Sequence, residues 1–277
     1  MIIDGKKTAA ELREDLKKKV ETMKMLKDKH VVITGGGSGI GASISEILAK
    51  SGAKTTIMGR NYKRLQEKTE NLPNGFAVSV DITDHKKVKI AFQNAVQQHG
   101  VIDILVNNAG NAISVPFEKL NTKEWNDMIT LNLTGVFHCT KACLPAMKKQ
   151  KWGRIINIAS TAGLKGYAYV TAYSAAKHGV IGLTRSLALE TANTGITVNA
   201  ICPGYTETGL TENAIENISL KTGITKSEAR EELLKSNPQK RFIQPEEIAN
   251  TVLWLCKKDA ASITGQAISI SGGEVMS

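Results

Sequence analysis

Tyr173 and Lys177, in the stretch YSAAKHG, are two residues of types that could move a proton, spaced one helical turn apart. A phenol has an ordinary pKa of about 10 and is a poor base at neutral pH. A lysine cation on the same helix face favours the phenolate and should lower that pKa. Polar pairs at this spacing are also common on exposed helix faces. The pair therefore predicts catalysis only if other residues support it.

Two polar residues that precede this pair give that support. Ser160 follows the apolar run RIINI, where a hydroxyl at the end of a buried strand could polarise a substrate oxygen. Asn132 lies inside a long, mostly apolar helical pattern, and a buried amide must find partners. It either bonds backbone or holds something in a site. Ser160, Tyr173, Lys177 and Asn132 are the candidate catalytic residues.

A glycine-rich stretch near the start of the chain, TGGGSGIG (34–41), has the setting of a dinucleotide-binding loop. It follows the apolar run HVVIT and opens a helical pattern, whereas the same glycines alone would indicate only a tight turn. Glycines let backbone N–H groups approach a pyrophosphate, and a helix N-terminus favours its charge. The candidate contacts are Gly35, Ser38, Gly39, Ile40 and Gly41.

Arg60 follows the second apolar run, at the position where a carboxylate would bond the adenosine ribose and select NAD(H). A guanidinium there can instead pair with a 2′-phosphate. The simpler alternative is a surface arginine that opens a helix. The charge favours NADP(H), and NAD(H) stays the alternative.

Three more turns follow predicted strands and complete the candidate cofactor site. Asp81 could accept a hydrogen bond from an adenine amino group, or merely start the next helix. Thr206 could bond the carboxamide or a phosphate. The residues of these turns are Asp81, Ile82, Asn108, Ala109, Gly110, Pro203, Gly204 and Thr206.

The elements that must position these residues alternate between short apolar runs and helical patterns. Such alternation predicts an α/β fold in which one doubly wound parallel sheet has helices on both faces. Residues 1–28 form a separate amphipathic helical extension, and residues 29–277 form one domain. The predicted strands are 30–34, 54–58, 76–80, 102–106, 154–158, 196–201 and 267–270, and the predicted helices include 61–70, 84–98 and 122–150.

Composition narrows the function classes. The 277 residues are 42% hydrophobic and carry a net charge of +10, which favours anionic partners such as phosphates, coenzyme A or an acyl carrier protein. Basic residues are scattered and aromatics are few, so we expect no nucleic-acid binding. No run is long enough for a membrane span and no signal-peptide pattern is present, so a cytoplasmic location is expected. The four cysteines are expected as free, packed thiols without a metal.

The motifs stand in an order that resembles the short-chain dehydrogenase/reductase family. They are TG-x-x-x-G-x-G (34–41), NNAG (107–110), Asn132, Ser160, Tyr173-x-x-x-Lys177 and Pro203-Gly204, and the resemblance covers about residues 29–273. It implies a Rossmann-type NAD(P)-binding domain in which Tyr173 donates the proton. It also implies that Lys177 holds the nicotinamide ribose, that Asn132 holds a proton-relay water and that the protein is a homotetramer.

The resemblance marks residues 205–243 as a mobile lid over the substrate. Two branches of the family are similar to this chain: 3-hydroxybutyrate dehydrogenases, and 3-oxoacyl and polyketide ketoreductases. The residues between Ser160 and Tyr173 help to distinguish their substrates. The first branch anchors a carboxylate with a His and a Lys at the positions of Ala162 and Val170. An apolar lining of Ala162, Leu164, Tyr167 and Val170 instead suits an acyl chain.

We therefore expect an NADPH-dependent reductase of a 3-oxoacyl thioester. The alternative is a dehydrogenase of another secondary alcohol: 3-hydroxybutyrate, a cyclic alcohol, a steroid or a sugar. A cofactor-binding regulator without catalysis is disfavoured, because every catalytic role is filled.

Overall fold

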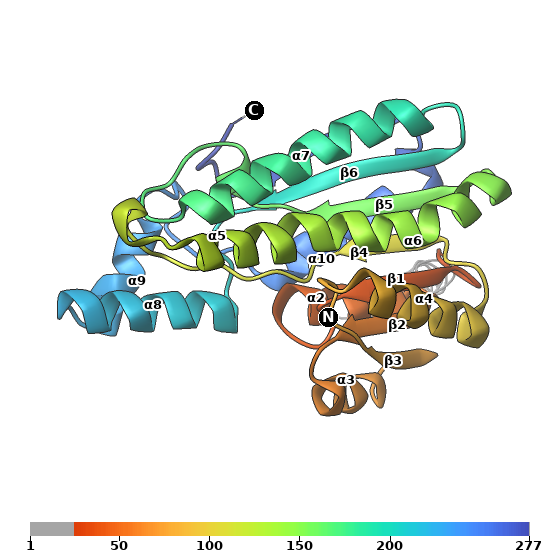
Figure 1. Cartoon of the computed structure of the whole chain (residues 1–277), viewed down its shortest axis with the longest axis horizontal. Helices are drawn as coiled ribbons and strands as arrows, with labels where there is room; N and C mark the ends of the chain where they lie inside the picture. The colour runs from red at the N-terminus through yellow and green to blue at the C-terminus, as the bar shows by residue number, and fades with distance from the viewer. Residues whose placement is uncertain (1–24, 277) are drawn as a thin grey trace, which may run out of the picture.

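The apolar runs predicted as strands all form strands, and these pair in parallel in one sheet (Figure 1). The computed structural model describes residues 25–276, and in that range the strand order is β3-β2-β1-β4-β5-β6-β7. The doubly wound α/β prediction is therefore confirmed. The strands are β1 (His30–Thr34), β2 (Lys54–Gly59), β3 (Gly75–Ser79), β4 (Ile104–Asn107), β5 (Gly153–Ile158), β6 (Ile196–Pro203) and β7 (Ala267–Ile270).

Helices cover both faces of the sheet, which explains why its central strands are buried along their whole length. One face packs against α2 and α10, and the other against α4, α6 and α7 (Figure 1). The helices are α2 (Gly39–Lys50), α3 (Tyr62–Thr69), α4 (His85–His99), α5 (Thr122–Ile129), α6 (Gly135–Gln150), α7 (Thr171–Thr191), α8 (Gly209–Thr222), α9 (Lys226–Leu234) and α10 (Pro245–Cys256).

The helix predicted over 122–150 contains a break in its hydrogen-bond pattern. A π-helical turn, Thr130–Thr134, joins α5 to α6 and contains Asn132. Such turns insert one extra residue and are frequent at functional sites.

The strand order reverses between β1 and β4, which pair with Val32 opposite Leu105. Ligands of such sheets bind at the carboxyl ends of the strands, at this reversal. The turns after β1, β4, β5 and β6 therefore come together at one edge of the sheet. They carry most of the residues singled out in the sequence.

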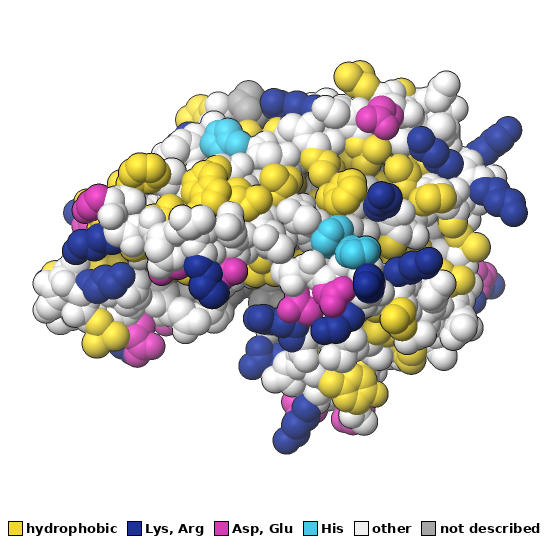
Figure 2. Space-filling model, viewed as in Figure 1, with side chains coloured by type: hydrophobic (Ala, Val, Ile, Leu, Met, Phe, Trp, Pro, Cys, Tyr) yellow, Lys and Arg dark blue, Asp and Glu magenta, His cyan; other side chains and the backbone are white. Residues whose placement is uncertain are grey.

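Residues 205–243 form a projection at one end of the molecule (Figure 1). Its helices α8 and α9 have an apolar cluster of their own, with Ile215, Ala229 and Phe242 buried at its centre. Figure 2 shows the surface hollowed between this projection and the part built from β3 and α3.

The predicted N-terminal helix, residues 1–28, lies mostly outside the described residues, which begin at 25. Leu26 already belongs to the core of the domain, since it is 2% exposed and its N–H donates to the Ser51 carbonyl at 2.9 Å. No helix in residues 25–276 is both long and apolar enough to cross a membrane.

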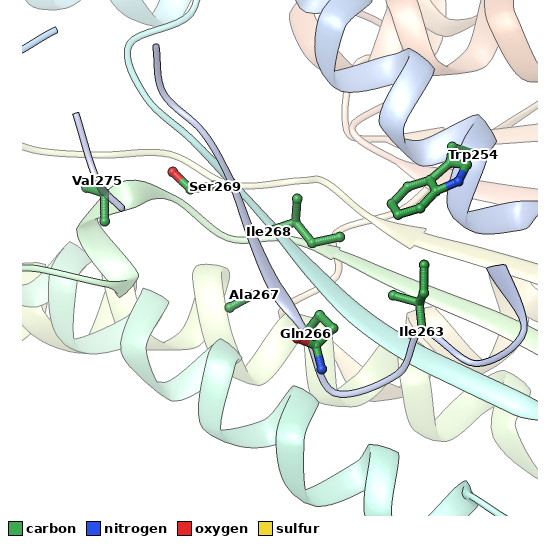
Figure 3. A pocket seen from close by; sticks show the side chains of 7 residues that line it. All are labelled: Trp254, Ile263, Gln266, Ala267, Ile268, Ser269 and Val275. Atoms are coloured by element: carbon green, nitrogen blue, oxygen red, sulfur yellow. The ribbon is translucent and has the colours of Figure 1, made fainter. Parts of the chain in front are cut away.

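The outer edge of the sheet carries a hollow of about 490 Å³ beside β7 (Figure 3). It is lined by Trp254, Ile263, Gln266, Ala267, Ile268, Ser269 and Val275. None of the predicted catalytic, cofactor or substrate-lining residues lines this hollow, so we do not assign the chemistry to it.

Candidate active site

Lys177 lies one helical turn after Tyr173 on α7, and its side chain is held in place. It is 5% exposed, its Nζ donates to the Ile158 carbonyl at 2.8 Å, and it lies 5.5 Å from the centroid of the Tyr173 ring. Burial lowers the pKa of Lys177 to about 8. The cation is thus fixed by the last residue of β5, within reach of the phenol.

Tyr173 is a proton donor at neutral pH. Burial raises the pKa of Tyr173 to about 12, and a hydrogen-bonding interaction with the Ser160 side chain acts in the opposite direction. The net direction is upward because the loss of hydration is the largest cause, and the expected effect of Lys177 on this pKa stays a prediction.

Ser160 lies between the end of β5 and a short 3-10 turn, Thr161–Gly163. Its backbone is extended, and its Oγ accepts a hydrogen bond from the Ala162 N–H at 3.1 Å. One acceptor position is therefore used, which leaves the hydroxyl proton to be donated to Tyr173 or to a substrate oxygen.

Asn132 is fully buried and bonds backbone, which is one of the two predicted alternatives. Its Nδ2 donates to the carbonyls of Asn111, at 2.9 Å, and of Met128, at 3.1 Å. Its Oδ1 accepts from the Asn111 N–H at 3.3 Å. Asn132 therefore pins the loop after β4 to the π-helical turn, and a relay water stays a prediction.

Gly110 brings this loop against Lys177. A Cβ placed on Gly110 would lie 2.7 Å from Asn132 Oδ1 and 3.7 Å from Lys177 Nζ. Gly110, Asn132 and Lys177 are therefore neighbours.

The glycine loop after β1 has a conformation that depends on its glycines. Gly35 and Gly39 have φ of 68° and 52°, and a Cβ on Gly41 would lie 2.2 Å from the Gly35 carbonyl oxygen. The Asn108 amide braces the loop by donating to the carbonyls of Thr34, at 3.0 Å, and Gly35, at 3.2 Å.

The first turn of α2 is suited to an anion. Ser38 is its N-cap residue but forms no side-chain cap hydrogen bond, and the turn holds no acidic residue. Its backbone N–H groups are therefore available, so the residues present fit a dinucleotide pyrophosphate. Ile40 contacts the core with its side chain, so it could reach a cofactor only through its backbone.

Arg60 is exposed, and a second guanidinium accompanies it. The Arg64 Cγ would lie 3.5 Å from a Cβ on Gly37, so Arg64 lies over the glycine loop. Both arginines are free of ion pairs within residues 25–276. Two cations thus flank the position expected for the adenosine ribose.

Asp81 does not start a helix, so that alternative is wrong. Asp84 is the N-cap residue of α4, whereas Asp81 Oδ1 accepts from the Thr83 N–H at 3.0 Å and the Thr83 hydroxyl at 2.8 Å. These bonds, together with the charge of Arg60, lower the pKa of Asp81. Ile82 next to it packs its side chain against α6 at Gly135, so only its backbone could meet a cofactor.

The remaining predicted cofactor residues form two braced turns. The Thr34 hydroxyl accepts from the N–H groups of Asn108 and Ala109, each at 3.0 Å. Pro203 ends β6, the Gly204 N–H donates to the Ile270 carbonyl at 2.9 Å, and the Thr206 hydroxyl donates to the Gly204 carbonyl at 3.0 Å. Thr206 is therefore part of the turn itself.

Residues 29–219 match the family model described as short chain dehydrogenase. The chain belongs to this family.

Relatives of the short-chain dehydrogenase family with different named substrates are almost equally similar. Identity is 40% over 252 residues to the D-beta-hydroxybutyrate dehydrogenase of Rhizobium meliloti, covering 88% of this chain and 98% of that one. It is 37% over 262 residues to a 3-oxoacyl-[acyl-carrier-protein] reductase of Staphylococcus aureus, covering 92% and 100%. A crystal structure of an actinorhodin polyketide ketoreductase variant with NADPH superposes with a TM-score of 0.86 at 36% identity, covering 89% and 97%.

In this short-chain dehydrogenase the hollow lined by Tyr167, a predicted substrate-lining residue, is less apolar than predicted. Ala162 is buried and Leu164 packs against the core, and neither lines this hollow. A hollow of about 370 Å³ lies instead between the loop before α7 and the end of α9. It is lined by Lys165, Gly166, Tyr167, Tyr205, Glu232, Leu233, Lys235 and Ser236.

Four residues with roles in the site were not predicted: Thr34, Arg64, Asn111 and Glu274. Thr34 opens the glycine-rich motif 34–41, Asn111 follows the motif 107–110, and Arg64 lies four residues after Arg60, so proximity could have indicated them. Glu274 follows the last strand, and the edge beyond a parallel strand is where site residues gather.

The described residues show no group of three or more His, Cys, Asp or Glu side chains that could hold a metal ion. All four cysteines are buried free thiols, as predicted. Burial raises the pKa of the Cys202 thiol, which adjoins Lys177, to about 11, so it is protonated at neutral pH.

Proposed function

We propose that the protein is an NADPH-dependent reductase of 3-oxoacyl thioesters, carried on coenzyme A or an acyl carrier protein. One observation carries this proposal: the hollow of about 370 Å³ lined by Tyr167, which we take as the substrate hollow, offers no unpaired cation to a free carboxylate. Lys165 is paired with Glu274 at 3.2 Å, and Lys235 is paired with Glu232. Ala162 and Val170 stand where the hydroxybutyrate branch is expected to carry its anchoring cations.

The buried Glu274 carboxylate adds to this argument. Its side chain is 2% exposed, and it accepts a hydrogen bond from the hydroxyl of Tyr167, which lines the hollow. Its charge holds the Lys165 ammonium in an ion pair, so that cation is not free to anchor a small free acid.

The catalytic groups suit reduction of a carbonyl. Tyr173 donates its phenolic proton to the carbonyl oxygen, and the Ser160 hydroxyl donates a hydrogen bond to the same oxygen. Lys177 stabilises the negative charge that develops on the Tyr173 oxygen as its proton leaves. A dihydronicotinamide, when bound, supplies the hydride. The glycine loop and α2 would hold its pyrophosphate.

Arg60 and Arg64 support NADP(H) over NAD(H), because two guanidinium groups can pair with a 2′-phosphate. The solved relative with NADPH is consistent with this preference. NAD(H) remains the alternative cofactor.

The test compares two substrates that share a 3-oxo group, acetoacetyl-coenzyme A and acetoacetate, each with NADPH and NADH. We expect kcat/KM to be highest for acetoacetyl-coenzyme A with NADPH. Arg60→Ala should remove most of the preference for NADPH. Tyr173→Phe should lower kcat by about 10²-fold or more while cofactor binding, followed by fluorescence, is retained. Faster turnover of acetoacetate would overturn the proposal.

The second candidate is a dehydrogenase of another secondary alcohol, including 3-hydroxybutyrate, a cyclic alcohol, a steroid or a sugar. The 40% identity to D-beta-hydroxybutyrate dehydrogenase favours it. Oxidation of such an alcohol, with no turnover of acetoacetyl-coenzyme A, would select this function.

We also propose a homotetramer that acts in the cytoplasm. Apolar side chains gather on the face formed by α6 and α7 (Figure 2). Exposed large apolar residues of these helices include Phe137 and Leu189, which is 82% exposed. Pairing of this face would bury them. Light scattering of the full chain measures the mass of the assembly.

A further inference from the structure

Glu274 joins three parts of the chain that are distant in sequence. It lies in the turn after β7, and its Oε1 accepts from the Tyr167 hydroxyl at 2.6 Å and the Ser236 hydroxyl at 2.9 Å. The Lys165 ammonium lies 3.2 Å from the same oxygen. Lys165 and Tyr167 belong to the loop between Ser160 and Tyr173, whereas Ser236 follows α9.

The turn that carries Glu274 is shaped to contact the end of α9 closely. Gly272 and Gly273 have φ of 62° and 91°. A Cβ on Gly272 would lie 2.3 Å from Asn237 Oδ1, and one on Gly273 would lie 3.3 Å from Pro238 Cγ. Side chains at these two glycines would push the end of α9 away from Glu274.

The segment formed by α8 and α9 (residues 209–236) has few other polar ties to the body of the protein. Its apolar cluster is internal, and the exposed ion pair between Glu216 and Lys226 joins its two helices to each other. Among the described residues, 25–276, side chains of this segment form two hydrogen bonds to residues outside 204–244. One is the bond from Ser236 to Glu274, and the other runs from Lys221 Nζ to the Ser114 carbonyl. That bond is exposed and 3.4 Å long.

We propose that Glu274 is a positioning residue that latches the α8–α9 segment against the loop leading to Tyr173. Its Oε1 accepts from both Ser236 and Tyr167, and both residues line the substrate hollow. Lys165 balances the buried charge. The effect on turnover rests on the proposed function, whereas the latch itself does not.

The experiment measures amide hydrogen exchange of residues 209–236 in the full chain, for Glu274→Ala, Ser236→Ala and Tyr167→Phe. We expect exchange in α9 to be at least about tenfold faster in Glu274→Ala, because a hydrogen-bonded charged partner is lost. Smaller increases are expected in the other two variants. Exchange in β1 and β4 should not change, which separates local opening from global unfolding.

Glu216→Gln is the matched control, because it breaks an ion pair inside the segment without touching the body. Apart from the residues of α8 and α9 that contact Glu216, hydrogen exchange in this variant should stay near that of the wild-type protein. If Glu274→Ala does not fold, Ser236→Ala and Tyr167→Phe still test the latch, since each removes one hydroxyl.

The kinetic readout is the KM for acetoacetyl-coenzyme A, which should rise more than kcat falls in Glu274→Ala. Ser236→Thr keeps a hydroxyl, so its KM should lie closer to the wild-type value than the KM of Ser236→Ala. Unchanged exchange in α9 of both Glu274→Ala and Ser236→Ala would overturn the latch. Faster exchange in a protein without thioester turnover would leave the latch standing and overturn the proposed function.

Discussion

Burial acts in opposite directions on the pKa values of the two central residues, Tyr173 and Lys177. It raises the pKa of the phenol to about 12 and lowers that of the ammonium to about 8. At neutral pH the phenol therefore keeps its proton, and most of the lysine is still charged. This combination favours carbonyl reduction, because alcohol oxidation requires Tyr173 as a phenolate base.

The rate of carbonyl reduction should depend on the charge of Lys177. As pH rises through about 8, Lys177 loses its proton and no longer stabilises the charge developing on the Tyr173 oxygen. We expect kcat/KM to fall through that range. Lys177→Met should be slower by about 10²-fold or more and lack this limb. A wild-type profile between pH 6 and 10 that stays level would contradict the assignment.

At the scale of elements, the sequence predicted what is local. Each candidate turn follows a strand of the sheet, so their gathering at one edge follows from the parallel topology. The π-helical turn around Asn132 was not predicted, because apolar periodicity in 122–150 does not reveal one extra residue. Glu274 was not predicted either, since its partners Tyr167 and Ser236 lie 107 and 38 residues away in sequence.

The packing of the loop after β4 against the π-helical turn leads to a prediction for Gly110→Ala. The added methyl would lie 2.7 Å from Asn132 Oδ1 and must displace that side chain or the loop. We expect kcat to fall at least about tenfold and the free energy of unfolding to fall by about 1–3 kcal/mol. Urea unfolding and steady-state kinetics measure both quantities.

The matched control is Gly209→Ala, at the first residue of α8, where a Cβ meets no atom within 4 Å. It should leave the free energy of unfolding within about 0.5 kcal/mol of the wild-type value. If Gly110→Ala changes kcat and the free energy of unfolding as little as Gly209→Ala does, Gly110 does not need to be glycine.

At the scale of the whole molecule, the two edges of the sheet have different chemistry. The carboxyl edge carries the site, whereas the amino edge buries His30, which is 1% exposed. Its Nδ1 lies 2.8 Å from the Gly100 carbonyl and its Nε2 lies 2.9 Å from the Thr56 hydroxyl. A neutral ring satisfies both partners. Burial lowers the pKa of His30 to about 4.

This buried ring should make the fold less stable in acid, independently of the active site. The unfolded chain protonates His30 with a pKa of about 6.5, whereas the folded protein resists protonation down to about pH 4. The contribution of His30 to the free energy of unfolding is therefore fully present above pH 6.5. It falls as pH decreases, by about 3 kcal/mol at pH 4.

Protonation of carboxylates such as Asp81 also lowers the free energy of unfolding in acid. The measured quantity is therefore the difference between wild type and His30→Gln in urea unfolding. Glutamine can keep a hydrogen bond to Gly100 but does not titrate, so its advantage should grow from pH 7 to pH 4.5. A constant difference would show that the histidine ring is not kept neutral by the fold.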